Sequence, residues 1–327
     1  MTALLLTRRV VEQLGDRMDT IAARHGATLA VTLLPDDPAE RMTVDQLGGL
    51  DAAFFSADIF PERSRAFFAA VQTAPNLKWV HTFNAGTDNP VFGRIRDAGA
   101  RLTTSSGSTA APIAQTAIAG LLMLARGFPG WLESQRRREW QPQSTIPADI
   151  AGQSMVVVGL GAIGMEIARL GQALGLHVTG VRRTPASGDE AVDALIHPDR
   201  IDDVLPQAHW LALAAPLTAQ THRIIDRRRL ALLPPGACIL NVGRGALVDE
   251  AAMIERLQAG TLGGAYLDVF EEEPLPAESP LWTFPNVIVT PHNSSISTGN
   301  EARTWEIFLH NLDCWLGGLP LRNEVAG

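Results

Sequence analysis

The chain of 327 residues has few cysteines, no long apolar run and no excess of positive charge. Its two cysteines, Cys238 and Cys314, are too few for a disulfide framework or a cysteine-rich metal site, and we expect both to be packed thiols in a reducing compartment. The 27 basic and 35 acidic side chains give a net charge of −8, which argues against nucleic acid as the main partner.

A membrane segment and a signal peptide are also missing from the pattern. The longest uncharged window, 102–125, contains many Thr, Ser and Gly residues, whereas a spanning helix needs about 20 mostly apolar residues. The apolar run near Met1 is only four residues long and ends at Arg8 and Arg9, too short for a signal peptide. We therefore expect a cytoplasmic protein without membrane association.

What the chain does have is enough apolar sequence for two ordered domains. Hydrophobic residues make up 46% and charged residues 19%, which excludes disorder as the main state. Short apolar runs alternate with helical patterns in both halves, and this alternation predicts an α/β fold with parallel sheets covered by helices. Strands are predicted at 3–6, 28–34, 51–56, 77–83, 100–104, 155–158, 177–181, 210–214, 238–242, 264–267 and 287–289.

Helices are predicted between and after these strands. One follows the first strand to about His25, and another, through 167–174, follows the strand at 155–158. Pro61 opens one that runs to Thr73, Ser108 or Thr109 caps a nearly all-apolar one that runs to about Phe128, and the last covers 300–315. A loop is expected from Pro129 onward, including three consecutive arginines at 136–138.

The strongest motif is a glycine-rich turn after the buried strand at 155–158. Glycines at its first, third and sixth positions allow a tight turn, close approach of a pyrophosphate, and close packing of the following helix on the strand. The free N–H groups at a helix N-terminus favour anions. The turn is therefore predicted to bind a dinucleotide through Gly159, Leu160, Gly161, Ala162, Ile163 and Gly164.

The end of the next strand indicates which dinucleotide. A site for NAD places a carboxylate there to bind the ribose hydroxyls, but this chain has Arg182, Arg183 and Thr184. Two guanidinium groups suit the 2′-phosphate of NADPH, so we predict NADPH preference with NADH still possible. The alternative is a solvated basic pair on a surface loop.

Three later segments carry groups suited to chemistry. Arg244 stands between two glycines after a strand, where its planar fork suits a carboxylate. Four carboxylates lie in 268–273, and His292, just after a strand and a proline, is a candidate proton donor. A hydrolase using Ser294 or Ser295 with His292 is a weak alternative, because neither serine lies in a G-x-S-x-G turn.

Together these motifs resemble those of the D-isomer-specific 2-hydroxyacid dehydrogenase family, in the branch of glyoxylate and hydroxypyruvate reductases. The matching segments, in chain order, are Asn84-Ala85-Gly86-Thr87-Asp88, the glycine turn, 205–218, 241–250, 267–274, Thr290-Pro291-His292 and 321–325. Gln115-Thr116 departs from the Glu-His that the family often has.

The resemblance implies two flavodoxin-like or Rossmann-like domains with the active site in the cleft between them. The substrate domain would be discontinuous, 1–102 plus 292–327, around a dinucleotide-binding domain of 103–291. Hydride would pass from NADPH to C2 of a small 2-keto acid, and the protein would be a homodimer. The apolar Phe128, Trp131 and Trp140 are expected either to serve the dimer interface or to pack inside the protein.

The resemblance also implies individual roles. His292 would be the acid–base group, Glu273 would hold it and favour its protonated form, and Arg244 would bind the substrate carboxylate and carbonyl. Ala85 and Gly86 would hold the substrate carboxylate through their N–H groups. Further cofactor contacts are expected at Thr109, Ala215, Pro216, Val242, Gly243 and Asp268, and no metal is expected. A dinucleotide-sensing protein on the same scaffold remains the alternative function.

Overall fold

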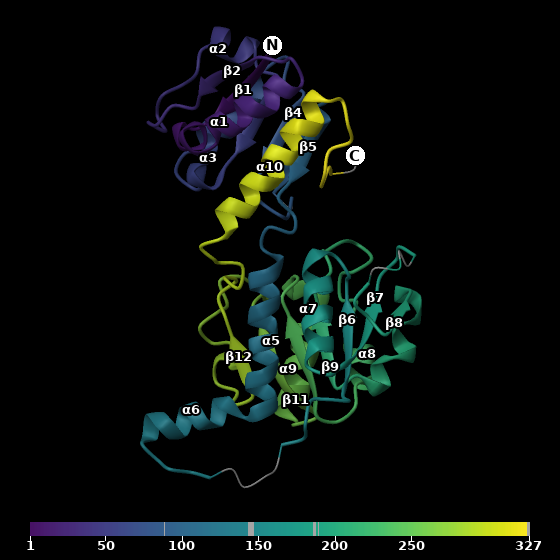
Figure 1. Cartoon of the computed structure of the whole chain (residues 1–327). Coiled ribbons are helices and arrows are strands. Elements are labelled where there is room, and N and C mark those ends of the chain that lie inside the picture. The colour runs from purple at the N-terminus through teal and green to yellow at the C-terminus, as the bar shows by residue number, and fades with distance from the viewer. Residues whose placement is uncertain (88, 143–146, 186–187, 189, 326–327) are drawn as a thin grey trace. The chain divides into compact units, whose positions relative to one another are not determined.

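The computed structural model describes residues 1–87, 89–142, 147–185, 188 and 190–325. The chain forms two compact units (Figure 1): unit 1 comprises Met1–Ser108 and Ser297–Gly327, and unit 2 comprises Thr109–Ile296. Both limits lie slightly later than the sequence indicated. Within unit 1, Arg303 of the last helix donates to the Ser108 carbonyl, and within unit 2, Asp268 binds the loop after His292.

Unit 1 is built on a parallel five-stranded sheet in the order β2-β1-β3-β4-β5, the flavodoxin-like order. All five predicted strands are present, and the short helices α2 and α4 were not predicted. Its elements are β1 (Thr2–Leu6), α1 (Arg8–Arg24), β2 (Leu29–Leu33), α2 (Val44–Gly48), β3 (Ala52–Phe55), η1 (Ala57–Ile59), α3 (Ser64–Thr73), β4 (Trp79–Thr82), α4 (Pro90–Asp97), β5 (Arg101–Thr104) and α10 (Asn300–Leu316).

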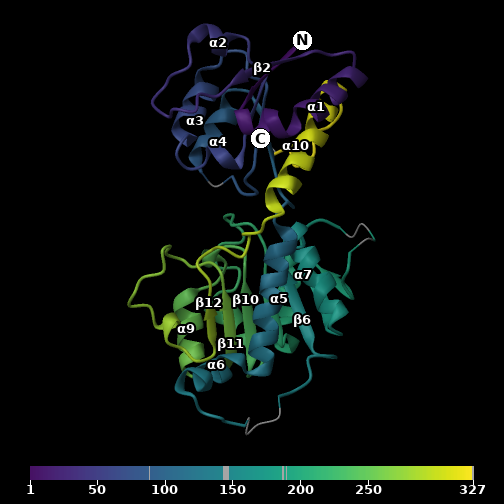
Figure 2. The same ribbon diagram turned by 60° about the vertical axis from the view of Figure 1, so that its left-hand side comes forward.

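The two faces of this sheet follow from the period-2 alternation of strand side chains. Leu4 and Leu6 of β1 pack toward α1 and α10, whereas Leu5 packs toward α3 and α4. Helix α10 lies beside α1 although nearly 300 residues separate them in the chain (Figure 2). The C-terminal segment is therefore an integral part of unit 1.

A buried histidine lies on β4, the strand next to the β5 edge of this sheet. His81 on β4 is fully buried, its Nδ1 and Nε2 lie 2.8 Å and 3.1 Å from the hydroxyls of Thr103 and Ser105, and its ring packs against Phe54 and Phe308. Burial lowers the pKa of His81 to about 3. The imidazole is therefore neutral in the folded protein at physiological pH.

Unit 2 is built on a parallel seven-stranded sheet in the order β12-β11-β10-β9-β6-β7-β8, which is the Rossmann order extended by one strand. The short, half-buried edge strand β8 was not predicted. Its elements are α5 (Ala110–Arg126), α6 (Phe128–Arg137), β6 (Ser154–Val158), α7 (Ala162–Ala173), β7 (His177–Val181), β8 (Ala194–Ile196), η2 (Pro198–Asp203), η3 (Leu205–Gln207), β9 (Trp210–Leu213), α8 (Arg227–Leu232), β10 (Ala237–Asn241), η4 (Gly245–Leu247), α9 (Glu250–Gln258), β11 (Leu262–Leu267), η5 (Pro280–Trp282) and β12 (Val287–Val289).

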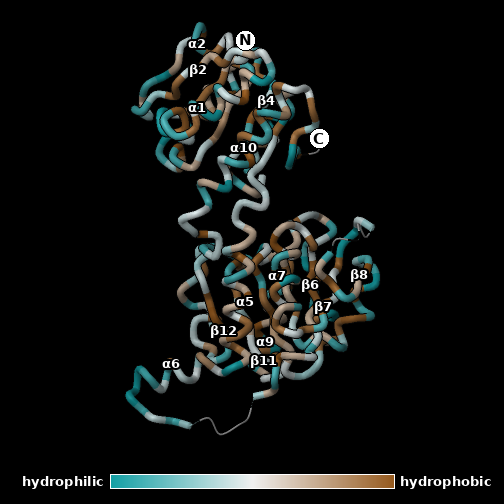
Figure 3. Tube along the Cα trace, viewed as in Figure 1, coloured by the Kyte–Doolittle hydropathy of each residue, from teal (hydrophilic) through white to brown (hydrophobic). Residues whose placement is uncertain are grey.

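Helices cover both faces of this sheet, whose strands are the most apolar part of the unit (Figure 3). Helices α5 and α7 pack on one face, and α8 and α9 pack on the other. Helix α5 lies so close to β11 that a Cβ on Gly120 would meet the Tyr266 ring at 2.5 Å.

The predicted loop after Pro129 is wrong, because Phe128–Arg137 forms helix α6. Proline is tolerated in a first helical turn, where its missing N–H would have no partner. Helix α6 follows the left-handed Gly127 and projects from the rest of unit 2 (Figure 1). Among the described residues no single helix is long and apolar enough to cross a membrane; only α5 and α6 together, bent by 72°, meet the criteria of length and composition.

The depressed pKa of His81 predicts a pH-dependent stability. Above about pH 6.5 the imidazole is neutral in both the folded and the unfolded state, so its burial does not lower the free energy of unfolding there. As the pH falls from about 6.5 toward 3, only the unfolded chain takes up the proton, and the free energy of unfolding falls by roughly 1.4 kcal/mol per pH unit. Urea unfolding at pH 7 and pH 5 should therefore show a larger loss in the wild type than in His81→Gln. Equal losses in the two proteins would contradict the assignment.

Candidate active site

The carboxyl ends of the parallel strands place the predicted site residues of unit 2 along one edge of its sheet. Strands β6, β9, β10, β11 and β12 all run in the same direction. The segments that follow them supply, in that order, the glycine turn, Ala215-Pro216, Val242-Gly243-Arg244, Asp268 and His292. The order of the strands reverses between β6 and β9, which is where open α/β sheets bind ligands.

The glycine turn has the shape that a pyrophosphate needs. Gly159 has a φ of +92°, and a Cβ on Gly164 would lie 1.9 Å from the Gly159 carbonyl oxygen, so both positions require glycine. Gly161, by contrast, has open space where its Cβ would be, and it caps α7 without a side-chain hydrogen bond. The N-terminus of α7 thus has no side-chain cap, and the turn fits the diphosphate of a dinucleotide.

The basic pair after β7 has unequal surroundings. Arg182 donates to the carbonyls of Thr184 and Pro185 at 3.0 Å and 2.6 Å, and it forms an ion pair with the nearly buried Glu190. Arg183 is exposed, and no described residue pairs with it. The sequence pattern did not distinguish the two arginines, because the partner Glu190 lies in the loop that follows rather than beside them.

Arg244 is held by its backbone at the end of β10. The Asn241 side chain donates to the Arg244 carbonyl at 3.0 Å, and the Arg244 Nη1 donates to the Gly243 carbonyl at 2.7 Å. A Cβ on Gly245 would lie 1.8 Å from the Phe270 carbonyl carbon, so only glycine allows this close approach. The backbone at Arg244 therefore packs directly against the segment that leads to Glu273.

The carboxylate and the histidine named from the sequence meet in space. The Glu273 Oε2 lies 2.8 Å from the His292 Nδ1, and the Glu273 Oε1 accepts the Phe270 N–H at 3.0 Å. The side chains of His292 and Glu273 are 48% and 36% exposed, so His292 remains accessible. With Nδ1 at the carboxylate, Nε2 is the nitrogen that can exchange a proton with a bound molecule.

Asp268 organises the loop that carries His292, a task that the sequence did not indicate. The Asp268 side chain is 2% exposed. Its carboxylate accepts hydrogen bonds from the Thr290 hydroxyl at 2.7 Å, the Asn293 N–H at 3.1 Å and the Ser294 N–H at 3.2 Å, and also from the Ser294 hydroxyl. The loop is thereby fixed on both sides of His292, whose own φ of +50° is unusual for a residue other than glycine. The predicted contact of Asp268 with the cofactor stays a prediction.

Other predicted positions lie on other segments of the chain. Ala85 and Gly86 belong to unit 1, in the loop after β4, and Asp88 lies outside the described residues. Thr109 caps α5 without a side-chain hydrogen bond. The roles of Ala85, Gly86 and Thr109 stay predictions. Among the described residues, no group of three or more His, Cys, Asp or Glu residues is arranged to hold a metal ion.

Known proteins share both the sequence pattern and the fold. The model of the family "D-isomer specific 2-hydroxyacid dehydrogenase, NAD binding domain" matches residues 118–294. The (S)-sulfolactate dehydrogenase of Chromohalobacter salexigens is 32% identical over 76% of this chain and 80% of the relative. Glyoxylate/hydroxypyruvate reductase B of Pectobacterium atrosepticum is 34% identical over 78% of this chain and 81% of the relative.

A solved structure matches the fold over nearly the whole chain. The D-isomer specific 2-hydroxyacid dehydrogenase of Xanthobacter autotrophicus, in complex with NADPH and MES, has a TM-score of 0.75 and 29% identity, covering 99% of this chain and 98% of the other. The matched family segment contains the glycine turn, Arg244 and the Glu273–His292 pair. The chain therefore belongs to the D-isomer specific 2-hydroxyacid dehydrogenase family.

Proposed function

We propose that this protein reduces a small 2-keto acid of the glyoxylate or hydroxypyruvate type, with NADPH as the preferred cofactor and His292 as the proton donor. The observation that carries the proposal is the Glu273–His292 pair at 2.8 Å, on the same sheet edge as a glycine turn shaped for a diphosphate. The Pectobacterium relative supports the substrate class, and the NADPH complex of the Xanthobacter relative supports the cofactor.

The chain's own residues account for the polar part of this reaction. When bound on the glycine turn, the cofactor supplies the hydride that reduces C2 of the keto acid. Negative charge then develops on the carbonyl oxygen, and the Nε2 of His292 delivers a proton there while Glu273 stabilises the resulting imidazolium. Arg244 stabilises the same oxygen and orients the substrate carboxylate, to which Ala85 and Gly86 offer N–H groups.

Asp268 acts in this scheme as a positioning residue. Its carboxylate fixes the 290–294 loop, so the direction of the His292 ring is set before substrate arrives. Pre-organisation of this kind keeps the proton donor within reach of the reacting oxygen. The two buried free cysteines support a location in a reducing compartment such as the cytoplasm.

Replacement of the proton donor tests the mechanism. Loss of general acid catalysis should lower the turnover number of His292→Ala by roughly 10²- to 10⁴-fold while NADPH affinity stays within about twofold. Turnover is followed as the loss of nicotinamide absorbance with glyoxylate, hydroxypyruvate, pyruvate and phenylpyruvate. His177→Ala, which changes an exposed histidine at the start of β7, is the matched control. Near-normal turnover in His292→Ala would remove His292 from the mechanism, and a wild type that binds NADPH without turnover would favour the sensing function.

The unequal arginines predict unequal effects on cofactor choice. A guanidinium–phosphate contact contributes about 1.5–3 kcal/mol, so Arg183→Ala should lower the NADPH-to-NADH ratio of kcat/KM by roughly 10- to 100-fold. Arg182→Ala removes the partner of Glu190 and should weaken both cofactors through the loop, with a smaller change in the ratio. Arg182→Asp should shift preference toward NADH. An unchanged ratio in all three variants would refute a phosphate-binding role for this pair.

The projecting helix α6 supports a homodimer. Phe128, Trp131 and Leu132 are each 37–41% exposed on it, and exposed apolar side chains grouped in this way are typical of an interface. We expect Trp131→Glu to convert the dimer into a monomer in analytical ultracentrifugation, because it places a charge in the apolar contact. Gln135→Glu, at an exposed position of the same helix, is the charge-matched control and should stay dimeric. A monomeric wild type would contradict the proposal.

A further inference from the structure

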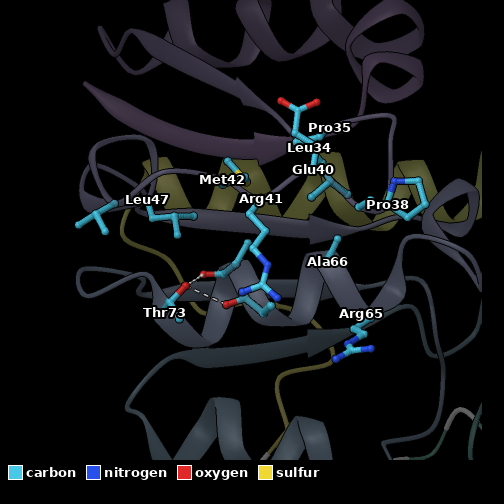
Figure 4. A pocket seen from close by; sticks show the side chains of 14 residues that line it. Leu34, Pro35, Pro38, Glu40, Arg41, Met42, Leu47, Arg65, Ala66 and Thr73 are labelled. Atoms are coloured by element: carbon cyan, nitrogen blue, oxygen red, sulfur yellow. Dashed lines mark hydrogen bonds between the residues drawn. The ribbon is translucent and has the colours of Figure 1, made fainter.

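Unit 1 contains a cavity that the proposed reaction does not use. The cavity has a volume of about 570 Å³, within the range of small-molecule sites. Its walls come from the loop between β2 and α2, from α2 itself and from α3 (Figure 4). These segments all lie on one face of the sheet, beside its β2 edge.

The inner wall of the cavity is apolar. Leu34, Leu47 and Ala70 line it and are almost fully buried, and Met42 and Ala66 complete the wall. The one hydroxyl that lines it, that of Thr73, already donates to the Ala69 and Ala70 carbonyls of its own helix. The inner wall therefore suits the hydrocarbon part of a ligand better than a sugar or a polyol.

The rim of the cavity is cationic. Arg41 extends from the loop and Arg65 from α3 (Figure 4), and no described residue forms an ion pair with either. The nearby Arg63 differs, because its guanidinium pairs with Asp36 and Asp58. Glu40 is the one acidic residue that lines the cavity, so the lining carries two guanidinium groups and one carboxylate. Guanidinium groups bind carboxylates and phosphates through paired hydrogen bonds.

The cavity is separate from the loop that carries Ala85 and Gly86. That loop follows β4, whereas the cavity borders β2, and β1 and β3 lie between these strands. Neighbouring strands are about 4.8 Å apart, so roughly 14 Å separates β2 from β4 across the sheet. A ligand in the cavity would therefore not occupy the place predicted for the substrate carboxylate.

We propose that this cavity binds an organic anion with a medium-length apolar body, either a carboxylate or a phosphate monoester. The apolar inner wall takes the hydrocarbon, and Arg41 and Arg65 hold the charged end. Neither part alone accounts for the site: an inorganic anion would leave the apolar wall in contact with water, and an uncharged lipid would leave the guanidinium groups without a partner.

Binding to the full-length protein tests this directly. Isothermal titration with octanoate and octyl phosphate should give dissociation constants below about 1 mM. The ligand that binds more tightly shows whether the site prefers a carboxylate or a phosphate. Octanol and acetate, which each lack one part of the ligand, should bind at least tenfold more weakly. The double variant Arg41→Glu/Arg65→Glu should weaken octanoate at least tenfold, whereas Arg94→Glu, at an exposed position of α4, should leave it unchanged.

Two further variants locate the bound anion. Ala69→Trp fills the cavity from an exposed position on α3 and should abolish octanoate binding while the protein remains folded by circular dichroism. Arg244→Ala should leave octanoate binding intact, because Arg244 belongs to unit 2. The proposal is overturned if neither anion binds, if octanol binds as tightly as octanoate, or if only Arg244→Ala abolishes binding.

Discussion

The buried carboxylate of Asp268 is the interaction on which the geometry of the candidate active site depends. A carboxylate at 2% exposure would be strongly destabilising without partners, and here several donors from one loop satisfy it. Those donors come from both sides of His292, so the same bonds that stabilise the buried charge also fix the histidine. Glu273 then has a defined ring to contact, and Gly245 brings the Arg244 segment against the neighbouring strand end.

Parallel strands explain why so many separate segments converge. Every strand of unit 2 ends at the same sheet edge, so five segments distant in the chain meet at the candidate site. The sheet of unit 1 follows the same rule, but its notable features lie elsewhere: a neutral buried histidine on β4 and an arginine-rimmed cavity beside β2. The two units therefore share an architecture and differ in where they place polar groups.

The sequence predicted the strands well because continuous apolar runs bounded by turn residues are strong signals for buried parallel strands. The edge strand β8 and the helices α2, α4, α6, α8 and α9 were missed, because they are short or begin at a proline that the pattern assigned to a loop. Arg244, Glu273 and His292 were found from their places after strands and from the family resemblance. The bonds of Asp268 to 290–294 and of Arg182 to Glu190 could not be read, because they depend on side chains meeting in space.

The discontinuous composition of unit 1 has a consequence for how the protein is made. Phe54 and Trp79 stack against Phe308 of α10, which leaves the ribosome after almost all of the rest of the chain. Until that helix emerges, this face of the first sheet is covered by α1 alone, whereas every segment of unit 2 is already available. The second unit can thus complete its core while the first still exposes aromatic surface, and the nascent protein is most vulnerable to aggregation in the interval before α10 docks.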